Sequence, residues 1–317
     1  MDAINETKKI IEKQVLKNDV FESGEIFGKY SKVYASSNEN IAGYMEKIDF
    51  QGCSKALTVM SSGDHPFNIA LNGIKTIDTF DSNALTEYSV LGIRRSAIIK
   101  YDYKQFLNFL KKIISYEISL DEVSDLINAF IPVMDEYYRK YWKEIKDYNY
   151  NLQKQYNTNI NLFRLLLKDL FTLENIEKNA YLKDEESYNK LRSIIKDVNI
   201  RFKCCDITEL SNEFNNEYDL AFLSNIPDYL YNVYGYNWRY DSLLDFEESI
   251  MKLLKSGGIA VLNYIYAYYF KQKDAYVRHL IRNSCIRKED LKDEEIISFS
   301  NSYFNNDVDA AILIKRK

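Results

Sequence analysis

Short apolar runs that end in small or acidic residues are the feature that most restricts the fold of this chain. One run covers residues 56–60 and another covers 76–80. A short helix fits between them, beginning near Pro66 and stopping at Gly73, because glycine is favoured just past a helix C-terminus. A strand, a helix and a strand within roughly 30 residues predict a βαβ unit with a right-handed crossover.

The same pattern returns in the last third of the chain. Apolar runs that are typical of strands alternate with one stretch of helical spacing, which two adjacent glycines end. The last two runs flank an Asn-Asn-Asp turn signal and predict an antiparallel pair. We therefore expect an α/β fold whose sheet is mostly parallel and closes with an antiparallel C-terminal strand pair. In order, the segments are strands at 199–204 and 218–223, a helix at 242–255, and strands at 259–262, 296–299 and 310–314.

A long stretch with helical periodicity and almost no glycine separates the two series, at about 103–196. Its apolar residues mark helix faces at 106–114, 123–134 and 162–171. Such an insertion is expected near the carboxyl edge of the sheet, as a lid, an acceptor pocket or a subdomain that covers one face. The predicted organisation is an N-terminal helical segment, 1–50, and a Rossmann-like domain, 51–317, that contains this insertion.

Composition restricts the partners and the compartment. The net charge of −5 argues against broad adhesion to nucleic acid or anionic membrane. Residues 1–17 are typical of a charged helix and not of a signal peptide, and the apolar stretch 259–270 is too short to span a bilayer. These patterns predict a cytoplasmic protein without a transmembrane segment. With two histidines and no C-x-x-C pair, no metal site is expected.

The ends of the predicted strands carry residues that suit a nucleoside. In open α/β sheets, ligands bind beyond the carboxyl ends of the strands, where the strand order reverses. Gly63 permits close approach of the backbone and a positive φ. Asp81 is placed to accept hydrogen bonds from both ribose hydroxyls, Asp206 from the adenine amino group, and Asp64 to pair with a ligand ammonium group. The alternative is that these are ordinary turn residues, but four in this order favour a nucleoside site.

The loop at 61–66 argues against a dinucleotide. It contains one glycine, whereas the G-x-G-x-x-G motif uses three to seat a pyrophosphate. Its acidic residue would also repel phosphate. A cationic sulfonium ligand suits the loop better.

Several segments together resemble a known family. They are V-M-S-S-G-D at 59–64, T-F-D-S-N at 79–83, the segment 98–106, and L-S-N-I-P-D-Y at 223–229. As a set, over about 27–230, they are similar to the Rossmann-like family related to the betaine-lipid synthase. That enzyme moves the 3-amino-3-carboxypropyl group of S-adenosylmethionine onto diacylglycerol. The segment L-L-K-S-G-G at 253–258 also resembles the L-K-P-G-G segment of class I methyltransferase-like folds.

The resemblance implies a class I methyltransferase-like Rossmann fold with S-adenosylmethionine as cosubstrate. It also implies that the segment 224–229 faces the reacting carbon. The tyrosine-rich C-terminal third and the lack of a clear lipid-docking helix depart from the synthase, so the acceptor stays open as a small molecule or a lipid-like one. The residues expected to bind the cofactor are Ser62, Gly63, Asp64, Asp81, Ser82, Asp206, Ser224 and Asn225.

Catalytic candidates lie at the edges of this site. A sulfonium is already activated for transfer, so the protein mainly supplies alignment and one base. Asp228 and His65 are the candidate bases, although both also fit solvated loops. Tyr229 belongs to an aromatic segment, 228–240, that fits either an acceptor pocket or cation–π stabilisation of the sulfonium. Asp102 suits a helix cap, or a residue that positions the insertion over the cofactor.

The expected activity is transfer of the 3-amino-3-carboxypropyl group to an unidentified acceptor. Two alternatives remain: an S-adenosylmethionine-dependent methyltransferase, and a non-catalytic nucleoside-binding module. The by-product separates the two transferases, because aminocarboxypropyl transfer leaves methylthioadenosine and methyl transfer leaves S-adenosylhomocysteine.

Overall fold

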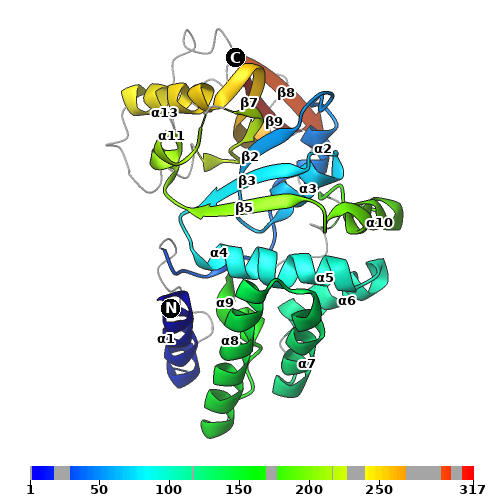
Figure 1. Ribbon diagram of the computed structural model, residues 1–317, viewed down its shortest axis with the longest axis vertical. Helices are drawn as coiled ribbons and strands as arrows, with labels where there is room; N and C mark the ends of the chain where they lie inside the picture. Colours follow the sequence, from blue (N-terminus) through cyan, green and yellow to red (C-terminus); the bar gives the residue numbers. More distant parts are fainter. Residues whose placement is uncertain are drawn as a thin grey trace.

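The computed structural model describes residues 2–17, 29–115, 118–168, 176, 178–215, 217–226, 240–268, 294–300 and 309–317. A seven-stranded sheet in the order β5-β3-β2-β6-β7-β9-β8 forms its centre (Figure 1). The strands are β2 (Lys55–Val59), β3 (Thr76–Asp81), β5 (Asn199–Cys204), β6 (Tyr218–Phe222), β7 (Leu254–Tyr268), β8 (Glu294–Ser300) and β9 (Asp309–Arg316).

The strand directions confirm the predicted fold class. β5, β3, β2, β6 and β7 pair in parallel, and β9 lies antiparallel between β7 and β8. The two C-terminal strands therefore form the predicted antiparallel pair. This mostly parallel α/β sheet is consistent with the methyltransferase-like form that the resemblance implies, and the predicted βαβ unit lies at β2 and β3.

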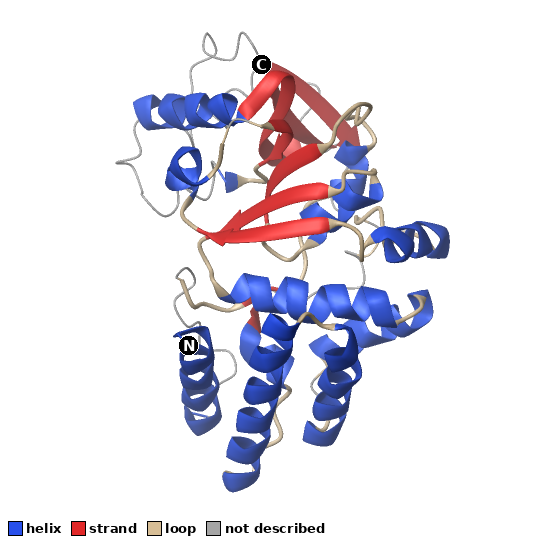
Figure 2. Cartoon of the chain, in the orientation of Figure 1, coloured by secondary structure: helices blue, strands red, loops and turns tan. Residues whose placement is uncertain are grey.

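Helices cover both faces of the sheet (Figure 2). Alternate strand residues face opposite layers: Ala56 belongs to one apolar cluster and Leu57 to the other. The Ala56 layer contains α3 (Asp64–Leu71) and α10 (Glu185–Ile194), and the Leu57 layer contains α11 (Leu210–Glu213) and α13 (Tyr240–Leu253). Burial on both faces is why β2, β3 and β6 are mostly apolar runs in the sequence. In the edge strand β5, exposed residues alternate with more buried ones.

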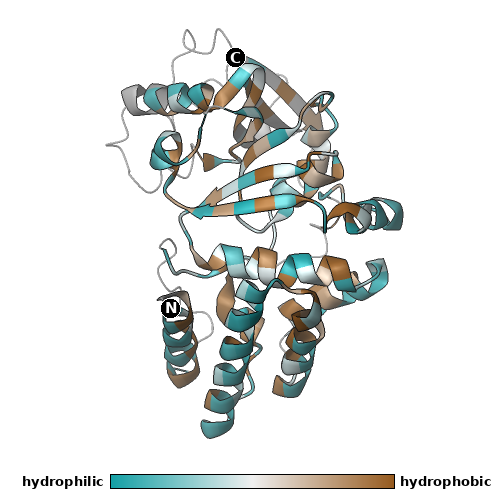
Figure 3. Cartoon of the chain, in the orientation of Figure 1, coloured by the Kyte–Doolittle hydropathy of each residue, from teal (hydrophilic) through white to brown (hydrophobic). Residues whose placement is uncertain are grey.

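The predicted helical insertion contains α6 (Tyr103–Ile114), α7 (Leu120–Phe130), α8 (Glu136–Gln155) and α9 (Leu162–Leu166). The N-terminal helix α1 (Asp2–Lys17) lies beside α8 (Figure 1), where Thr7 Oγ1 and Tyr141 Oη are 2.6 Å apart. Mostly hydrophilic residues are visible along α8 (Figure 3). The cap predicted at Asp102 is confirmed: its side chain accepts from the backbone N–H of Gln105 in a capping box.

Two helix ends differ from the sequence prediction. α9 ends at Leu166 and not at 171, because the next two residues form β4 (Leu167–Lys168), which pairs with β1 (Val33–Tyr34). α13 ends at Leu253, before the two glycines, because Leu254 already pairs with Tyr218 of β6. In both places strand pairing, which depends on distant residues, overrides the local helical spacing.

After β3, a π-helix, η1 (Tyr88–Arg94), joins α4 (Leu85–Glu87) to α5 (Arg95–Lys100). No pattern in the sequence predicted this π-helix. Such segments are rare and frequently lie at functional sites. Among the described helices, none combines the length and apolar character needed to cross a bilayer.

Candidate functional site

The strand order reverses between β2 and β6. β3 and β5 lie on one side of this boundary, and β7 lies on the other. The turns that follow β2 and β6 contain non-glycine residues with positive φ, Ser61 at 45° and Ser224 at 59°. Such backbone conformations cost energy and cluster at ligand sites. The boundary is where an open α/β sheet binds its ligand.

Asp81 lies at the tip of β3, against the turn that follows β2. Its Oδ2 accepts the backbone N–H of Ser61 at 3.0 Å, and its Oδ1 accepts that of Asn83 at 2.9 Å. Burial raises the pKa of Asp81, although these two hydrogen bonds oppose the shift. The carboxylate predicted to bind the ribose is therefore close to the loop predicted to approach the ligand.

Gly63 is required in this turn for two reasons. Its φ is +88°, which disfavours any residue with a Cβ. A Cβ at this position would also lie 2.6 Å from Cγ1 of Val90 in the π-helix. On the side where a Cβ of Gly63 would project, the group that comes close to its backbone is thus the protein's own π-helix.

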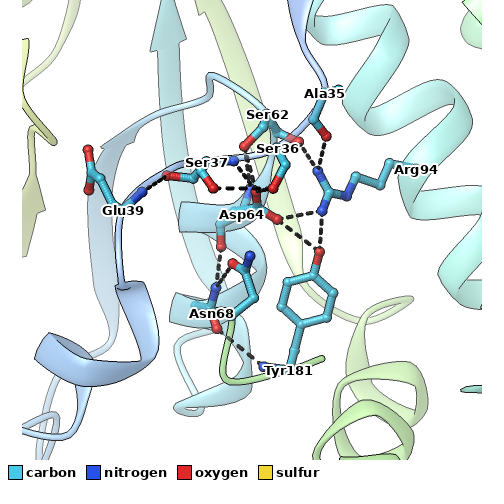
Figure 4. Close-up of polar contacts among 10 residues, drawn as sticks. Ala35, Ser36, Ser37, Glu39, Ser62, Asp64, Asn68, Arg94 and Tyr181 are labelled. Atoms are coloured by element: carbon cyan, nitrogen blue, oxygen red, sulfur yellow. Dashed lines mark hydrogen bonds and ion pairs between the residues drawn. The ribbon is translucent and has the colours of Figure 1, made fainter. Parts of the chain in front are cut away.

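Asp64 is fully buried in a polar network (Figure 4). Its carboxylate accepts from the backbone N–H of Ser37 at 2.7 Å, Ser62 Oγ at 2.7 Å, Tyr181 Oη at 3.0 Å and Arg94 Nη2 at 2.5 Å. The predicted contact with a ligand ammonium group would require at least one of these protein donors to leave.

Arg94 connects this network to the neighbouring turns. Its guanidinium also donates to the carbonyl oxygens of Ala35 at 3.1 Å and Ser62 at 2.7 Å. Burial disfavours the charged form, but the Asp64 carboxylate and Tyr181 outweigh that cost and raise the pKa of Arg94. Arg94 therefore remains charged in the interior, and its contacts fix the turn at Ser62.

The remaining predicted cofactor residues on this side lie at the tips of β3 and β5. Asp206 caps a short 3-10 helix, η4 (Ile207–Glu209), and its Oδ1 accepts from the backbone N–H of Thr208 at 2.9 Å. Ser82 is exposed, and its carbonyl accepts from Cys204 Sγ at 3.6 Å. Burial raises the pKa of Cys205 to about 12, which makes that thiol a poor nucleophile.

A second buried cluster spans the boundary between β2 and β6. Ser224 Oγ donates to Glu39 Oε1, and His65 Nε2 lies 3.1 Å from Glu39 Oε2. Both Glu39 and His65 are 1% exposed. Asn225 lies beside Ser224, and Oγ of Ser224 is 3.3 Å from Oδ1 of Asn225. The structure thus brings His65 and Ser224 together through Glu39, a residue that the sequence analysis missed.

Glu39 could not be found from sequence spacing. It belongs to no recognisable motif and is separated from Ser224 by 185 positions. Only the folded chain brings them together. The predicted catalytic residues Asp228 and Tyr229, and the aromatic residues up to 239, lie outside the described residues.

Two cavities border the helical insertion and α1. Their volumes are about 670 and about 310 Å³, and both have Ala3, Tyr88 and Tyr137 in their walls. Glu87 and Cys204 also line the smaller one, which places it at the tip of β5. In the described part of the chain, no group of three or more His, Cys, Asp or Glu side chains forms a metal site.

Comparison with known proteins identifies no family for this chain. No family model matches the sequence. No curated protein matches it either. An rRNA methylase from Streptococcus thermophilus is a similar solved structure, with 15% sequence identity, 42% of this chain and 69% of that chain covered, and a TM-score of 0.23. A similarity this low carries no argument about activity, so the α/β fold assignment rests on the strand order and directions described above.

Proposed function

We propose that this protein is an S-adenosylmethionine-dependent transferase that moves the 3-amino-3-carboxypropyl group to an acceptor. The observation that carries the proposal is the position of Asp81. Its carboxylate, at the tip of β3, accepts from the backbone N–H of Ser61, which belongs to the same turn as Gly63. A carboxylate at the end of this strand is where a Rossmann-like sheet binds the ribose hydroxyls.

Residues at the ends of the other strands are assigned to the remaining parts of the ligand. Asp206 binds the adenine amino group, while Ser62, Gly63 and Ser82 line the nucleoside. Ser224 and Asn225, across the boundary, face the sulfonium end. We assign Asp64 to fixing the turn through Arg94 and not to the ligand, because its carboxylate already accepts from five protein donors.

The choice of transferred group rests on the resemblance of four sequence segments to the betaine-lipid synthase family. The acceptor is a small molecule or a lipid-like molecule. The cavity of about 310 Å³ at the tip of β5 supports the expectation that the insertion contributes to the acceptor pocket. Methyl transfer is the alternative for the same fold, and the by-product decides between them.

The decisive experiment tests Asp81 and the by-product in turn. Calorimetric titration with S-adenosylmethionine should give saturable binding that Asp81→Asn weakens about 10- to 100-fold, the effect of losing hydrogen bonds to a charged group. Asp121→Asn, in the helical insertion, is the matched control and should bind like the unaltered protein. Mass spectrometry of the reaction should then detect methylthioadenosine.

Three outcomes contradict the proposal in different ways. Absence of binding removes the cosubstrate assignment. S-adenosylhomocysteine as the product would establish methyl transfer. Saturable binding without either product, across hydroxyl and amine acceptors, would identify a nucleoside-binding module.

A further inference from the structure

We propose that His65 Nδ1 takes up the proton released by the acceptor and that Glu39 is the positioning residue that holds His65 for this step. The proposal rests on the transferase activity proposed above. It restricts the acceptor to a nucleophile that loses a proton during transfer, a hydroxyl or an amine, and excludes a carboxylate.

The geometry of the cluster carries this inference. Glu39 comes from the loop before α2 (Ile41–Met45), His65 from the first turn of α3, and Ser224 from the turn after β6. One carboxylate oxygen of Glu39 accepts from Ser224 Oγ, and the other lies 3.1 Å from His65 Nε2. The three segments therefore meet at the boundary where the ligand is expected.

His65 has one ring nitrogen held and one open. Because a carboxylate only accepts, its contact with Nε2 places a proton on that nitrogen. Nδ1 is then the basic lone pair of the neutral ring. Among the described residues, Nδ1 is buried and has no hydrogen-bond partner. Buried polar atoms are nearly always satisfied, so an unsatisfied one needs an explanation, and a catalytic role is one that fits a basic ring nitrogen.

Other charged and polar groups lie near the Glu39–His65 pair. Asp64, the preceding residue, is bound to Arg94 at 2.5 Å. Lys178 Nζ donates to the carbonyl of Asn38 at 3.3 Å, and Tyr264 Oη accepts the backbone N–H of Asn40 at 2.9 Å. Glu39 is thus the carboxylate in contact with His65, and its negative charge stabilises the imidazolium, as the buried aspartate does in a Ser-His-Asp triad.

The step balances without a further reactant. The acceptor oxygen or nitrogen forms a bond to the carbon next to sulfur in the aminocarboxypropyl group. The C–S bond breaks, and its electron pair stays on sulfur to give neutral methylthioadenosine. The proton of the acceptor moves to His65 Nδ1, and the resulting imidazolium pairs with Glu39.

The first test is spectroscopic and does not depend on an acceptor. The chain has two histidines, so ¹⁵N-labelled histidine gives two ring systems, and His279→Asn assigns them. We expect the neutral His65 ring to be protonated on Nε2 with Nδ1 free. Glu39→Leu removes the acceptor and should populate the other tautomer. A proton on Nδ1 in the unaltered protein would overturn the proposal.

The second test measures methylthioadenosine release from S-adenosylmethionine with glycerol or ethanolamine as the acceptor probe. Glu39→Gln keeps the shape of the side chain and removes its charge. It should lower kcat about 100-fold, the usual scale of general-base catalysis, and leave the KM for S-adenosylmethionine unchanged. Glu46→Gln, at the exposed end of α2, is the matched control and should behave like the unaltered protein.

The outcomes separate the two proposals. A raised KM with an unchanged kcat in Glu39→Gln would assign Glu39 to cosubstrate binding and overturn its role in proton transfer. If the unaltered protein releases no methylthioadenosine with either probe, the transferase proposal fails. The histidine spectra still decide in that case whether Nδ1 is the open, basic nitrogen.

Discussion

At the scale of single residues, the turn after β2 is defined by what surrounds one glycine. Gly63 combines a φ of +88° with the closest contact of the π-helix, at Val90. From the sequence, the conformational freedom of Gly63 was expected to let the backbone approach a ligand. The structure confirms the positive φ and shows that the space on the Cβ side belongs to Val90. A side chain at position 63 would push the turn after β2 away from the π-helix.

Gly63→Ala should lower the free energy of unfolding by about 2–4 kcal/mol, the sum of a left-handed backbone penalty and overpacking. Gly73→Ala is the matched control. Its φ is +95°, but no other side chain or backbone of the described residues comes within 4 Å of its Cβ position, so about 1–2 kcal/mol is expected. Urea unfolding measures both. Equal losses would show that Val90 yields without cost, and Val90→Ala should rescue part of the Gly63→Ala loss.

At the scale of elements, the sequence predicted strands and helices that show a local pattern of apolar residues. It did not predict features that depend on pairing between distant residues. The strands at 56–60, 76–80 and 218–223 were predictable because most of their residues are buried. The edge strand at 199–204 was predictable because exposed residues alternate with more buried ones along it. The end of α9 was not, because Leu167 leaves the helix to pair with Val33. The π-helix leaves no periodic signal. In the same way, Asp81 was a visible strand-end carboxylate, whereas Glu39 acquires its neighbours only on folding.

Asp219 shows how one side chain joins three strands. Its carboxylate accepts from the backbone N–H groups of Ser54 and Lys55 at 2.8 and 2.9 Å, at the start of β2, and pairs with Lys255 of β7 at 3.0 Å. Burial opposes ionisation, but these donors outweigh it and lower the pKa of Asp219 to about 2.

The lowered pKa makes this contribution to stability depend on pH. The unfolded carboxyl titrates near 3.8, so the stabilisation is complete above that value and is lost as pH falls towards 2. After allowance for solvent screening we expect it to amount to about 1 kcal/mol. Asp219→Asn should therefore be less stable than the unaltered protein at neutral pH, and the gap should narrow with acidification in urea unfolding. A gap that does not change with pH would contradict this assignment.

At the scale of the whole molecule, the Asp64–Arg94 pair joins segments that are far apart in the sequence (Figure 4). Arg94 belongs to the π-helix, Ala35 to the N-terminal loop, Ser62 to the turn after β2, and Tyr181 to the stretch between α9 and α10. The predicted boundary between an N-terminal segment and a Rossmann-like domain remains a prediction. The network nevertheless ties residues from both sides of it to one buried charge pair.

Removing one partner of the Asp64–Arg94 pair should lower the free energy of unfolding of the protein. Arg94→Met leaves the Asp64 carboxylate buried without its cation and should cost about 3–5 kcal/mol. Tyr181→Phe removes two hydrogen bonds, one from Arg94 and one to Asp64, and should cost about 2 kcal/mol. Asp64→Asn combined with Arg94→Met should recover part of the loss, because no unpaired charge remains. Circular dichroism and tryptophan fluorescence during urea unfolding measure these differences. If Arg94→Met costs no more than Tyr181→Phe, the ion pair does not hold the site segments together.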